Sequence, residues 1–134
     1  KKRLSEEYGY EIIDFGTYSE ESVDYPDYGS KVAEAVSKGK FKYGILICGT
    51  GLGMCIVANK YPGIRAGVAY SDEAASLLKR HNNANIICLG GRTMNFEEAF
   101  KRVLIWLNEN FEGGRHKRRV DKIINIEVSR CFSK

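Results

Sequence analysis

The sequence predicts an α/β fold in which helices cover both faces of a mostly parallel sheet. Two observations carry this prediction. Short apolar runs alternate along the chain with segments whose apolar residues recur at helical spacing. The apolar runs also lack polar alternation, which is typical of strands that are buried on both faces. The 134 residues suit a single domain, taken as residues 1–134, with a three-layer α/β/α arrangement.

The strands are predicted from the apolar runs, which cover residues 10–16, 43–48, 64–70 and 83–90. The polar segment 17–28 contains Pro26 and is predicted as a loop. Ligands of such folds bind beyond the carboxyl ends of the strands. We therefore expect Cys48–Gly49, Tyr70–Ser71 and Gly90–Gly91 to meet at one functional edge of the sheet.

The helices are predicted from apolar spacing together with start and stop signals. They are the amphipathic start of the chain (1–11), 28–37 before Gly39, 51–61 before Pro62-Gly63, and three helices that follow Ser71, Asn95 and "EGGRH". Ser71 and Asn95 are predicted N-caps. In the last helix, Val120, Ile123, Ile124 and Val128 are expected to face inward.

The stretch "ICGTGLGM" (47–54) places Cys48 and three glycines directly after a predicted strand. Neither the dinucleotide motif GxGxxG nor the P-loop motif GxxxxGK[ST] fits it, so both nucleotide sites are set aside. Glycines let backbone N–H groups approach an anion, or a charge that develops during a reaction. The alternative is a tight turn without a ligand. A thiol before a helix start favours the thiolate, which can act as nucleophile or base.

Four further residues are candidate site residues. His81 lies in the polar segment "KRHNNAN" and can exchange protons near neutral pH, although it can equally be an ordinary solvated histidine. Arg92 follows the last predicted strand and points to the same edge as Cys48. Arg115 and Arg119 are four residues apart and share a helix face that suits a phosphate dianion. The alternative there is a solvated basic face.

Composition restricts the class of protein. The net charge is +4, and much of it lies in "GGRHKRR" (113–119). No apolar run is long enough to span a membrane and no signal peptide opens the chain, so we expect a soluble, intracellular protein. The four cysteines form no CxxC pair and are expected to be free thiols. Cys55, Cys88 and Cys131 are predicted to be small apolar residues rather than reactive ones.

Seven motifs occur in a fixed order along nearly the whole chain: "DYPDY" (24–28), "ILICGTGLGM" (45–54), "AN" (58–59), "GIRA" (63–66), "RHNNAN" (80–85), "GGR" (90–92) and "GGRHKRR" (113–119). This ordered set resembles the ribose-5-phosphate isomerase B family, which also includes galactose-6-phosphate and allose-6-phosphate isomerases. The resemblance implies a Rossmann-like fold and a cytoplasmic homodimer, or a tetramer, with shared active sites. It also implies interconversion of ribose 5-phosphate and ribulose 5-phosphate through an enediolate, in the pentose phosphate pathway, without metal or cofactor.

The resemblance also assigns roles to individual residues. Cys48 would be the base that moves a proton between C2 and C1. The residues that would stabilise the enediolate oxygen are Gly49, Thr50, Gly51 and Gly53. His81 would help to open the furanose ring with Asn82 beside it, and Tyr25 would line the pocket. The phosphate would be held by Arg92, Arg115 and Arg119, some of them from the partner chain.

The sequence departs from the family pattern in one respect, and three other functions remain possible interpretations. The family's first strand and its Asp-His loop have no counterpart here, so we expect the printed sequence to be an incomplete version of the natural polypeptide. The substrate can also be a hexose 6-phosphate, such as allose or galactose 6-phosphate. Without the Asp-His loop the chain can be a non-catalytic sugar-phosphate-binding module. Nucleic-acid binding through 113–119 is disfavoured because no aromatic residues are interleaved with the cations.

Overall fold

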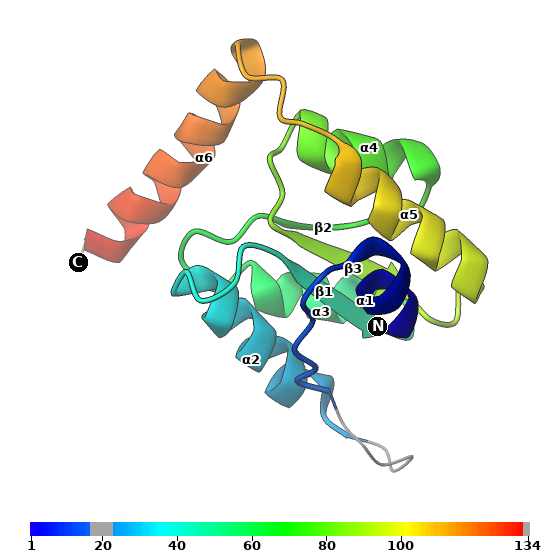
Figure 1. The fold of residues 1–134 in the computed structure, drawn as a ribbon. Helices are drawn as coiled ribbons and strands as arrows, with labels where there is room; N and C mark the ends of the chain where they lie inside the picture. Colours follow the sequence, from blue (N-terminus) through cyan, green and yellow to red (C-terminus); the bar gives the residue numbers. More distant parts are fainter. Residues whose placement is uncertain (17–22, 133–134) are drawn as a thin grey trace.

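The computed structural model describes residues 1–16 and 23–132, with Cys131 and Phe132 described by their backbone alone. Its sheet has three parallel strands in the order β1-β3-β2, formed by Gly44–Cys48, Ile86–Gly90 and Ala66–Val68. The helices of the described residues are α1 (Lys2–Tyr8), α2 (Tyr25–Ser37), α3 (Leu52–Ala58), α4 (Asp72–Arg80), α5 (Phe96–Asn108) and α6 (Arg115–Phe132). Figure 1 shows α2 and α3 on one face of the sheet and α4 and α5 on the other, which confirms the three-layer prediction.

Two apolar clusters fill the spaces between the layers. The cluster on the α2 and α3 side includes Ala33, Val36, Leu46, Met54 and Ile86. The cluster on the α4 and α5 side includes Leu4 of α1, Ala75, Leu89, Val103 and Trp106. The central strand β3 contributes to both and is buried along its whole length. This double burial explains its unbroken apolar sequence.

The predicted caps are confirmed. The hydroxyl of Ser71 accepts a hydrogen bond from the backbone N–H of Ala74 at 3.0 Å, at the start of α4. The side-chain oxygen of Asn95 accepts one from the N–H of Glu98 at 2.9 Å, at the start of α5. Each satisfies an N–H group that has no partner within its helix. Gly39 follows α2 with a φ of 77°, a left-handed conformation that ends the helix.

The predicted strand at residues 10–16 is wrong. This segment has no regular secondary structure, and it lines one side of an apolar cavity of about 570 Å³ that β1 lines on the other. Because the cavity lies between the two backbones, the segment makes no ladder hydrogen bonds with β1. The apolar pattern of "YEIIDFG" instead reflects side-chain packing, since Ile12 contacts the cluster on the α4 and α5 side.

The boundary of α2 also differs from the prediction. The helix begins at Tyr25 rather than at residue 28, with Pro26 in its first turn. Proline is tolerated there because the N–H group it lacks would have no helical acceptor. Residues 23–24 remain a loop as predicted, and residues 17–22 lie outside the described residues. The strands and α3 are shorter than predicted, but they lie where the apolar runs placed them.

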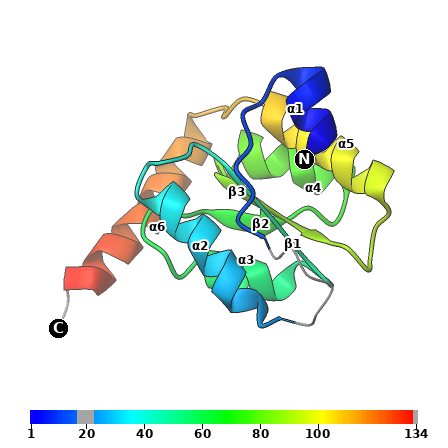
Figure 2. The ribbon, with the colours of Figure 1, turned by 60° about the horizontal axis from the view of Figure 1, so that its bottom comes forward.

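Helix α6 projects from the rest of the molecule (Figures 1 and 2). Val120 is buried as expected, but Ile123 and Val128 are about half exposed, so the prediction that they face inward is wrong within one chain. A cavity of about 760 Å³ separates the helix from loops of the body, and Ile123 and Ile126 line it. In the part of the chain that the structure describes, no helix is both long and apolar enough to cross a membrane.

Candidate functional site

Cys48 lies at the carboxyl edge of the sheet, as the strand order requires. It ends β1 and pairs in register with Gly90, the last residue of β3. Its Sγ accepts a hydrogen bond from the backbone N–H of Gly51 at 3.1 Å. The thiol is half-buried, so one side faces the loop while another remains accessible. An N–H donor directed at sulfur stabilises a negative charge there.

The glycines of the loop allow close approaches that other residues would block. Gly51 has a φ of 84°, and a Cβ atom on it would lie only 3.1 Å from the Leu89 backbone. A Cβ atom on Gly53 would lie 2.5 Å from the ring of Tyr25. The loop thus packs against β3 on one side and against Tyr25 on the other. Thr50 is exposed at its tip, where its hydroxyl accepts a hydrogen bond from the N–H of Leu52 at 3.2 Å.

Arg92 joins Cys48 and the glycine loop at this edge. Its backbone N–H donates to the carbonyl of Gly49 at 2.9 Å, and the N–H of Gly91 donates to the carbonyl of Cys48 at 2.7 Å. The Arg92 side chain lies 3.3 Å from the position that a Cβ atom on Gly49 would occupy. The structure therefore brings a cation against the glycine loop, at the sheet edge where Cys48 ends β1, as predicted from the strand ends.

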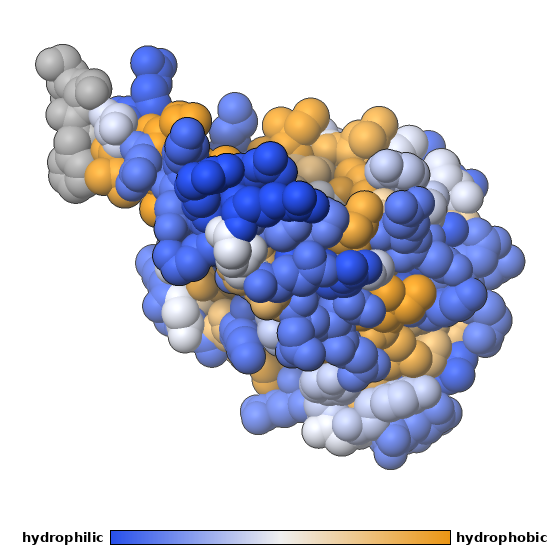
Figure 3. Space-filling model, turned by 90° about the horizontal axis from the view of Figure 1, so that it is seen from above, coloured by the Kyte–Doolittle hydropathy of each residue, from blue (hydrophilic) through white to orange (hydrophobic). Residues whose placement is uncertain are grey.

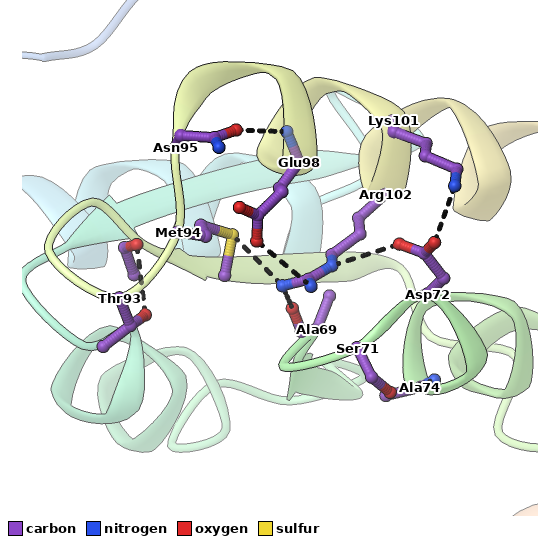
Figure 4. A network of polar contacts seen from close by, with 11 residues as sticks. Ala69, Ser71, Asp72, Ala74, Thr93, Met94, Asn95, Glu98, Lys101 and Arg102 are labelled. Carbon is purple, nitrogen blue, oxygen red and sulfur yellow. Dashed lines mark hydrogen bonds and ion pairs between the residues drawn. The ribbon is translucent and has the colours of Figure 1, made fainter.

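A polar network connects α4 and α5 near this edge of the sheet. Figure 4 shows Arg102 of α5 reaching toward Asp72 at the start of α4 and toward the carbonyl of Ala69. The distances from the guanidinium are 3.3 Å to the Asp72 carboxylate and 3.2 Å to the carbonyl. Lys101 approaches Asp72 at 2.8 Å. Hydrogen bonding to Lys101, followed by that to Arg102, lowers the pKa of the Asp72 carboxyl.

His81 and Asn82 lie at the opposite edge of the sheet. His81 caps the C-terminus of α4, and the chain enters β3 five residues later. Arg65 braces this loop by donating to the carbonyl of Asn82 at 3.1 Å and to that of Asn83 at 2.9 Å. Asn82 is exposed. The loop is thus held by its backbone, which leaves the Asn82 side chain free to contact a ligand.

Sequence reasoning missed two neighbours of His81. The ring of His116 stacks on that of His81 with centroids 3.9 Å apart and planes 9° apart. Glu112 lies beside both rings and also binds Arg80 at 2.6 Å. Burial lowers the pKa of His116, and His81 and Arg115 act in the same direction. The Arg80 hydrogen bond lowers the pKa of Glu112. Nothing in the sequence indicated that Glu112 and His116 lie beside His81, although His116 belongs to the basic motif at residues 113–119.

Arg115 and Arg119 also belong to this second edge. They are exposed in the first turns of α6, on either side of the buried His116 in sequence. Lys117 is directed elsewhere and pairs with Asp121 at 2.7 Å. Seen from the end of the molecule at which α6 begins, hydrophilic surface gathers around this region, with apolar patches beside it (Figure 3). Two guanidiniums and a histidine form a surface that suits a phosphate.

The predicted site residues therefore form two groups rather than one. The first group, at the carboxyl edge, consists of Tyr25, Cys48, Gly49, Thr50, Gly51, Gly53 and Arg92. The second, at the amino edge, consists of His81, Asn82, Arg115 and Arg119. Five residues of β1 separate the edges, a strand length of about 13 Å. One chain thus does not bring the thiol and His81 to the same small substrate.

Cys55 of α3 and Cys88 of β3 form a pair of thiols close to Cys48. The thiol of Cys55 in α3 donates to the carbonyl of Ala66 at 3.4 Å, and the Asn59 amide lies 3.6 Å from its sulfur. A hydrogen bond with Cys88 lowers the pKa of Cys55 to about 7, while the same bond and burial raise the pKa of Cys88. Cys88 is fully buried, as predicted, whereas Cys55 is only partly so. The side chain of Cys131 lies outside the described residues.

Comparisons with known proteins show which family the chain belongs to. A family model described as Ribose/Galactose Isomerase matches residues 1–123. Ribose-5-phosphate isomerase B of Escherichia coli (strain K12) is 48% identical over 124 residues, which cover 92% of this chain and 83% of that protein.

Two solved structures are similar throughout. Ribose-5-phosphate isomerase B of Clostridium thermocellum has a TM-score of 0.91 at 52% identity, covering 96% of this chain and 86% of its own. The enzyme of Mycoplasma genitalium, a crystal structure with bound ribulose-5-phosphate, has a TM-score of 0.89 at 44% identity, covering 96% and 88%. With motifs, fold and sequence in agreement, this chain belongs to the Ribose/Galactose Isomerase family.

Proposed function

We propose that this chain is an aldose–ketose isomerase that interconverts ribose 5-phosphate and ribulose 5-phosphate through an enediolate, without a cofactor. The observation that carries the proposal is the contact between the Cys48 thiol and the glycine loop, in which the N–H of Gly51 donates to the sulfur. Its relatives' activity supports the choice of substrate, because the Escherichia coli and Clostridium thermocellum proteins are named ribose-5-phosphate isomerase B.

The reaction needs a base and a place for negative charge within reach of each other. Cys48, as thiolate, removes the proton from C2 of the open-chain aldose, and the electrons move to the carbonyl oxygen to form the enediolate. The hydroxyl proton on O2 moves to O1, and Cys48 then returns its own proton to C1, which leaves the carbonyl at C2 and gives the ketose. The N–H groups of Gly49 and Gly53 and the hydroxyl of Thr50 stabilise the enediolate oxygen, while the N–H of Gly51 stays directed at the Cys48 sulfur. Tyr25 closes the pocket from the side of α2.

The remaining roles belong to the second group of residues. His81 transfers the proton that opens the furanose ring, with Asn82 beside it, and Arg115 and Arg119 hold the phosphate together with Arg92. Because the second group lies at the far edge of its own sheet, its residues act in the site of a second copy of the chain, next to that copy's Arg92. The exposed apolar residues Ile123, Ile126 and Val128 on α6 support such an interface.

The site is therefore shared between two copies in a homodimer, which can pair further into a tetramer. Residues 1–134 act as one isomerase domain. A cytoplasmic location is supported by the three free cysteines of the described side chains, which suit a reducing compartment. The pentose phosphate pathway is the metabolic setting that interconverts these two sugars.

Isomerisation in deuterated water tests the proposal. The wild-type chain, given ribose 5-phosphate, is expected to incorporate deuterium at the carbon that exchanges its proton through Cys48, as followed by proton NMR. Cys48→Ser should lower kcat by about 10²- to 10⁴-fold, because a hydroxyl is a much weaker base than a thiolate. Full activity in Cys48→Ser would contradict the mechanism, and binding without turnover would favour a non-catalytic binding module.

A hexose 6-phosphate substrate is the second candidate. The family model that matches this chain covers both ribose and galactose isomerases, which supports testing both sugars. A six-carbon sugar requires a longer span between Cys48 and the phosphate-binding arginines. Comparing kcat/KM for ribose 5-phosphate, allose 6-phosphate and galactose 6-phosphate decides between them.

A further inference from the structure

Arg102 of α5 is a largely buried cation that has no part in the proposed reaction. Its side chain is 13% exposed. The guanidinium group contacts the Asp72 carboxylate at 3.3 Å, the Ala69 carbonyl at 3.2 Å and the Met94 sulfur at 3.5 Å. Figure 4 shows these contacts converging from the start of α4, the residue after β2 and the loop before α5. One planar group with five donors can hold three such segments together, which a single ammonium group cannot do.

The ion pair with Asp72 does not explain this arrangement. Lys101, the neighbouring residue of α5, approaches the same carboxylate more closely, at 2.8 Å. What Arg102 adds is its contact with the Ala69 carbonyl and with the Met94 sulfur. These two atoms belong to the connections that follow β2 and β3, which are neighbouring strands of the sheet. Arg102 therefore joins two loops at the carboxyl edge.

The second of these loops, residues 90–94, is a tight turn that carries Arg92. The Gly90 carbonyl accepts a hydrogen bond from the N–H of Met94 at 3.2 Å, which closes the turn. The Arg92 N–H donates to the Gly49 carbonyl at 2.9 Å, so the front of the turn rests on the glycine loop. A shift of Met94 at the rear of the turn changes the direction of Arg92, because only one residue separates them.

The Arg92 side chain depends on this turn for its direction. Arg92 is exposed, and its guanidinium lies over Gly49 rather than in an ion pair of the described residues. A long side chain without an ion pair keeps much of its rotamer freedom. The backbone of the turn therefore determines which part of the carboxyl edge the guanidinium can reach, and small displacements of a binding group have large effects on substrate placement.

We propose that Arg102 is a positioning residue for Arg92. By holding Met94 and Ala69, it keeps the turn in the orientation that directs Arg92 toward the phosphate of the substrate. The inference rests on the proposed function, in which Arg92 helps to hold that phosphate. Cys48 has its own contact with the glycine loop, so loss of Arg102 weakens substrate binding and leaves the chemical step unchanged.

Steady-state kinetics with ribose 5-phosphate test the inference. Arg102→Met should raise KM about 10-fold and leave kcat within about threefold of the wild type, because binding is lost equally from the ground and transition states. Arg102→Lys should have an intermediate KM, since an ammonium keeps the charge but cannot hold both loops. Lys101→Met is the matched control, because it removes a cation beside Asp72 from the adjacent position and should leave KM unchanged. An equal rise of KM in Arg102→Met and Lys101→Met, or a lower kcat with unchanged KM in Arg102→Met, would overturn the inference.

Calorimetric titration with inorganic phosphate gives a measurement that does not depend on turnover. Arg102→Met and Arg92→Ala should each weaken phosphate binding. The double variant should bind phosphate no more weakly than Arg92→Ala alone, because Arg102 acts only through Arg92. A further loss of affinity in the double variant, or unchanged affinity in Arg102→Met, would overturn the inference. Thermal unfolding checks the fold of each variant, and Arg102→Lys replaces Arg102→Met in the cycle if Arg102→Met does not fold.

The inference and the proposed function fail in different ways. Wild-type phosphate affinity in Arg92→Ala would contradict the phosphate role of Arg92, and the inference about Arg102 would fall with it. Absence of isomerisation by the wild-type chain would contradict the proposed function alone. The phosphate titrations would then still decide whether Arg102 positions Arg92.

Discussion

The contact between Gly53 and Tyr25 shows how tightly the carboxyl-edge pocket is built. A Cβ atom on Gly53 would lie 2.5 Å from the ring of Tyr25, which is closer than non-bonded carbon atoms approach each other in proteins. The atoms in the way are at the far end of a tyrosine side chain that is partly exposed. If alanine replaces Gly53, the Tyr25 ring can therefore move aside, and the backbone of α3 need not change.

We predict that Gly53→Ala lowers kcat/KM for ribose 5-phosphate by about 10- to 100-fold, because Tyr25 leaves the pocket and the substrate is misplaced. The melting temperature should change little, since alanine suits the first turn of a helix better than glycine does. Steady-state kinetics and thermal unfolding check both parts. In a Tyr25→Ala background, Gly53→Ala should have little further effect. Additive losses would mean that the loop itself, and not the ring, is displaced.

Single residues differ in how far the sequence could predict them. Cys48 and Arg92 could be placed together because both follow strands of one parallel sheet. His116 could not be paired with His81, because their contact depends on how α6 leaves the body. Lys79 could not be predicted at all, because lysine normally prefers water. It is 4% exposed, and its Nζ lies 4.2 Å from the ring centre of Tyr43 and 4.9 Å from that of Trp106.

The ion pairs of Asp72 connect α4 with α5 at the level of whole elements. The carboxylate lies at the start of α4, and Lys101 and Arg102 extend to it from α5 (Figure 4). The pKa of this carboxyl is lower in the folded chain than in the unfolded one. The unfolded chain consequently takes up the proton first as the pH falls.

We predict that the stabilisation from Asp72 is fully present above about pH 4, near the ordinary pKa of aspartate, and is lost as the pH falls below it. Urea denaturation at several pH values, followed by circular dichroism, measures this dependence. Asp72→Asn should unfold more easily at neutral pH and show a smaller further loss in acid. An Asp72→Asn chain with the acid dependence of the wild type would contradict this origin of the loss.

Elements are predictable where apolar periodicity and a local signal agree. The helices after Ser71 and Asn95 have both, and their caps form as predicted. Residues 10–16 have a strand-like apolar pattern, but a strand also requires a neighbouring backbone, which one sequence segment cannot reveal. The apolar residues of α6 pointed to a buried face, yet periodicity does not say which surface, in the same chain or in another, covers that face.

At the scale of the whole molecule, the predicted site residues lie in two groups at opposite edges of one sheet. The carboxyl edge has the thiol, the glycine loop and Arg92, and the amino edge has His81 with Arg115 and Arg119. The proposed dimer combines one half from each chain. The family resemblance implied a site shared between chains, and the register of the strands supplies a geometric reason, because it places the two groups of predicted residues at opposite edges.

Mixing two inactive variants tests this division. Cys48→Ser and Arg119→Ala homodimers should both be nearly inactive. After refolding together, half of the dimers contain one chain of each kind, and one of their two sites has both halves intact, so about a quarter of wild-type activity should return. Cys48→Ser mixed with Arg92→Ala is the matched control. These two residues share one edge, and no site is restored. Equal recovery in both mixtures would contradict a shared site.

The projection of α6 from the body has a consequence for how the enzyme works at low concentration. If the arginines that hold the phosphate are carried away from their own thiol, a chain that separates from its partner loses a substrate site even though its fold persists. Turnover per chain then falls on dilution, and substrate, by bridging the two chains, favours their association. The amount of enzyme in the cell would thus set the activity of each molecule as well as their number.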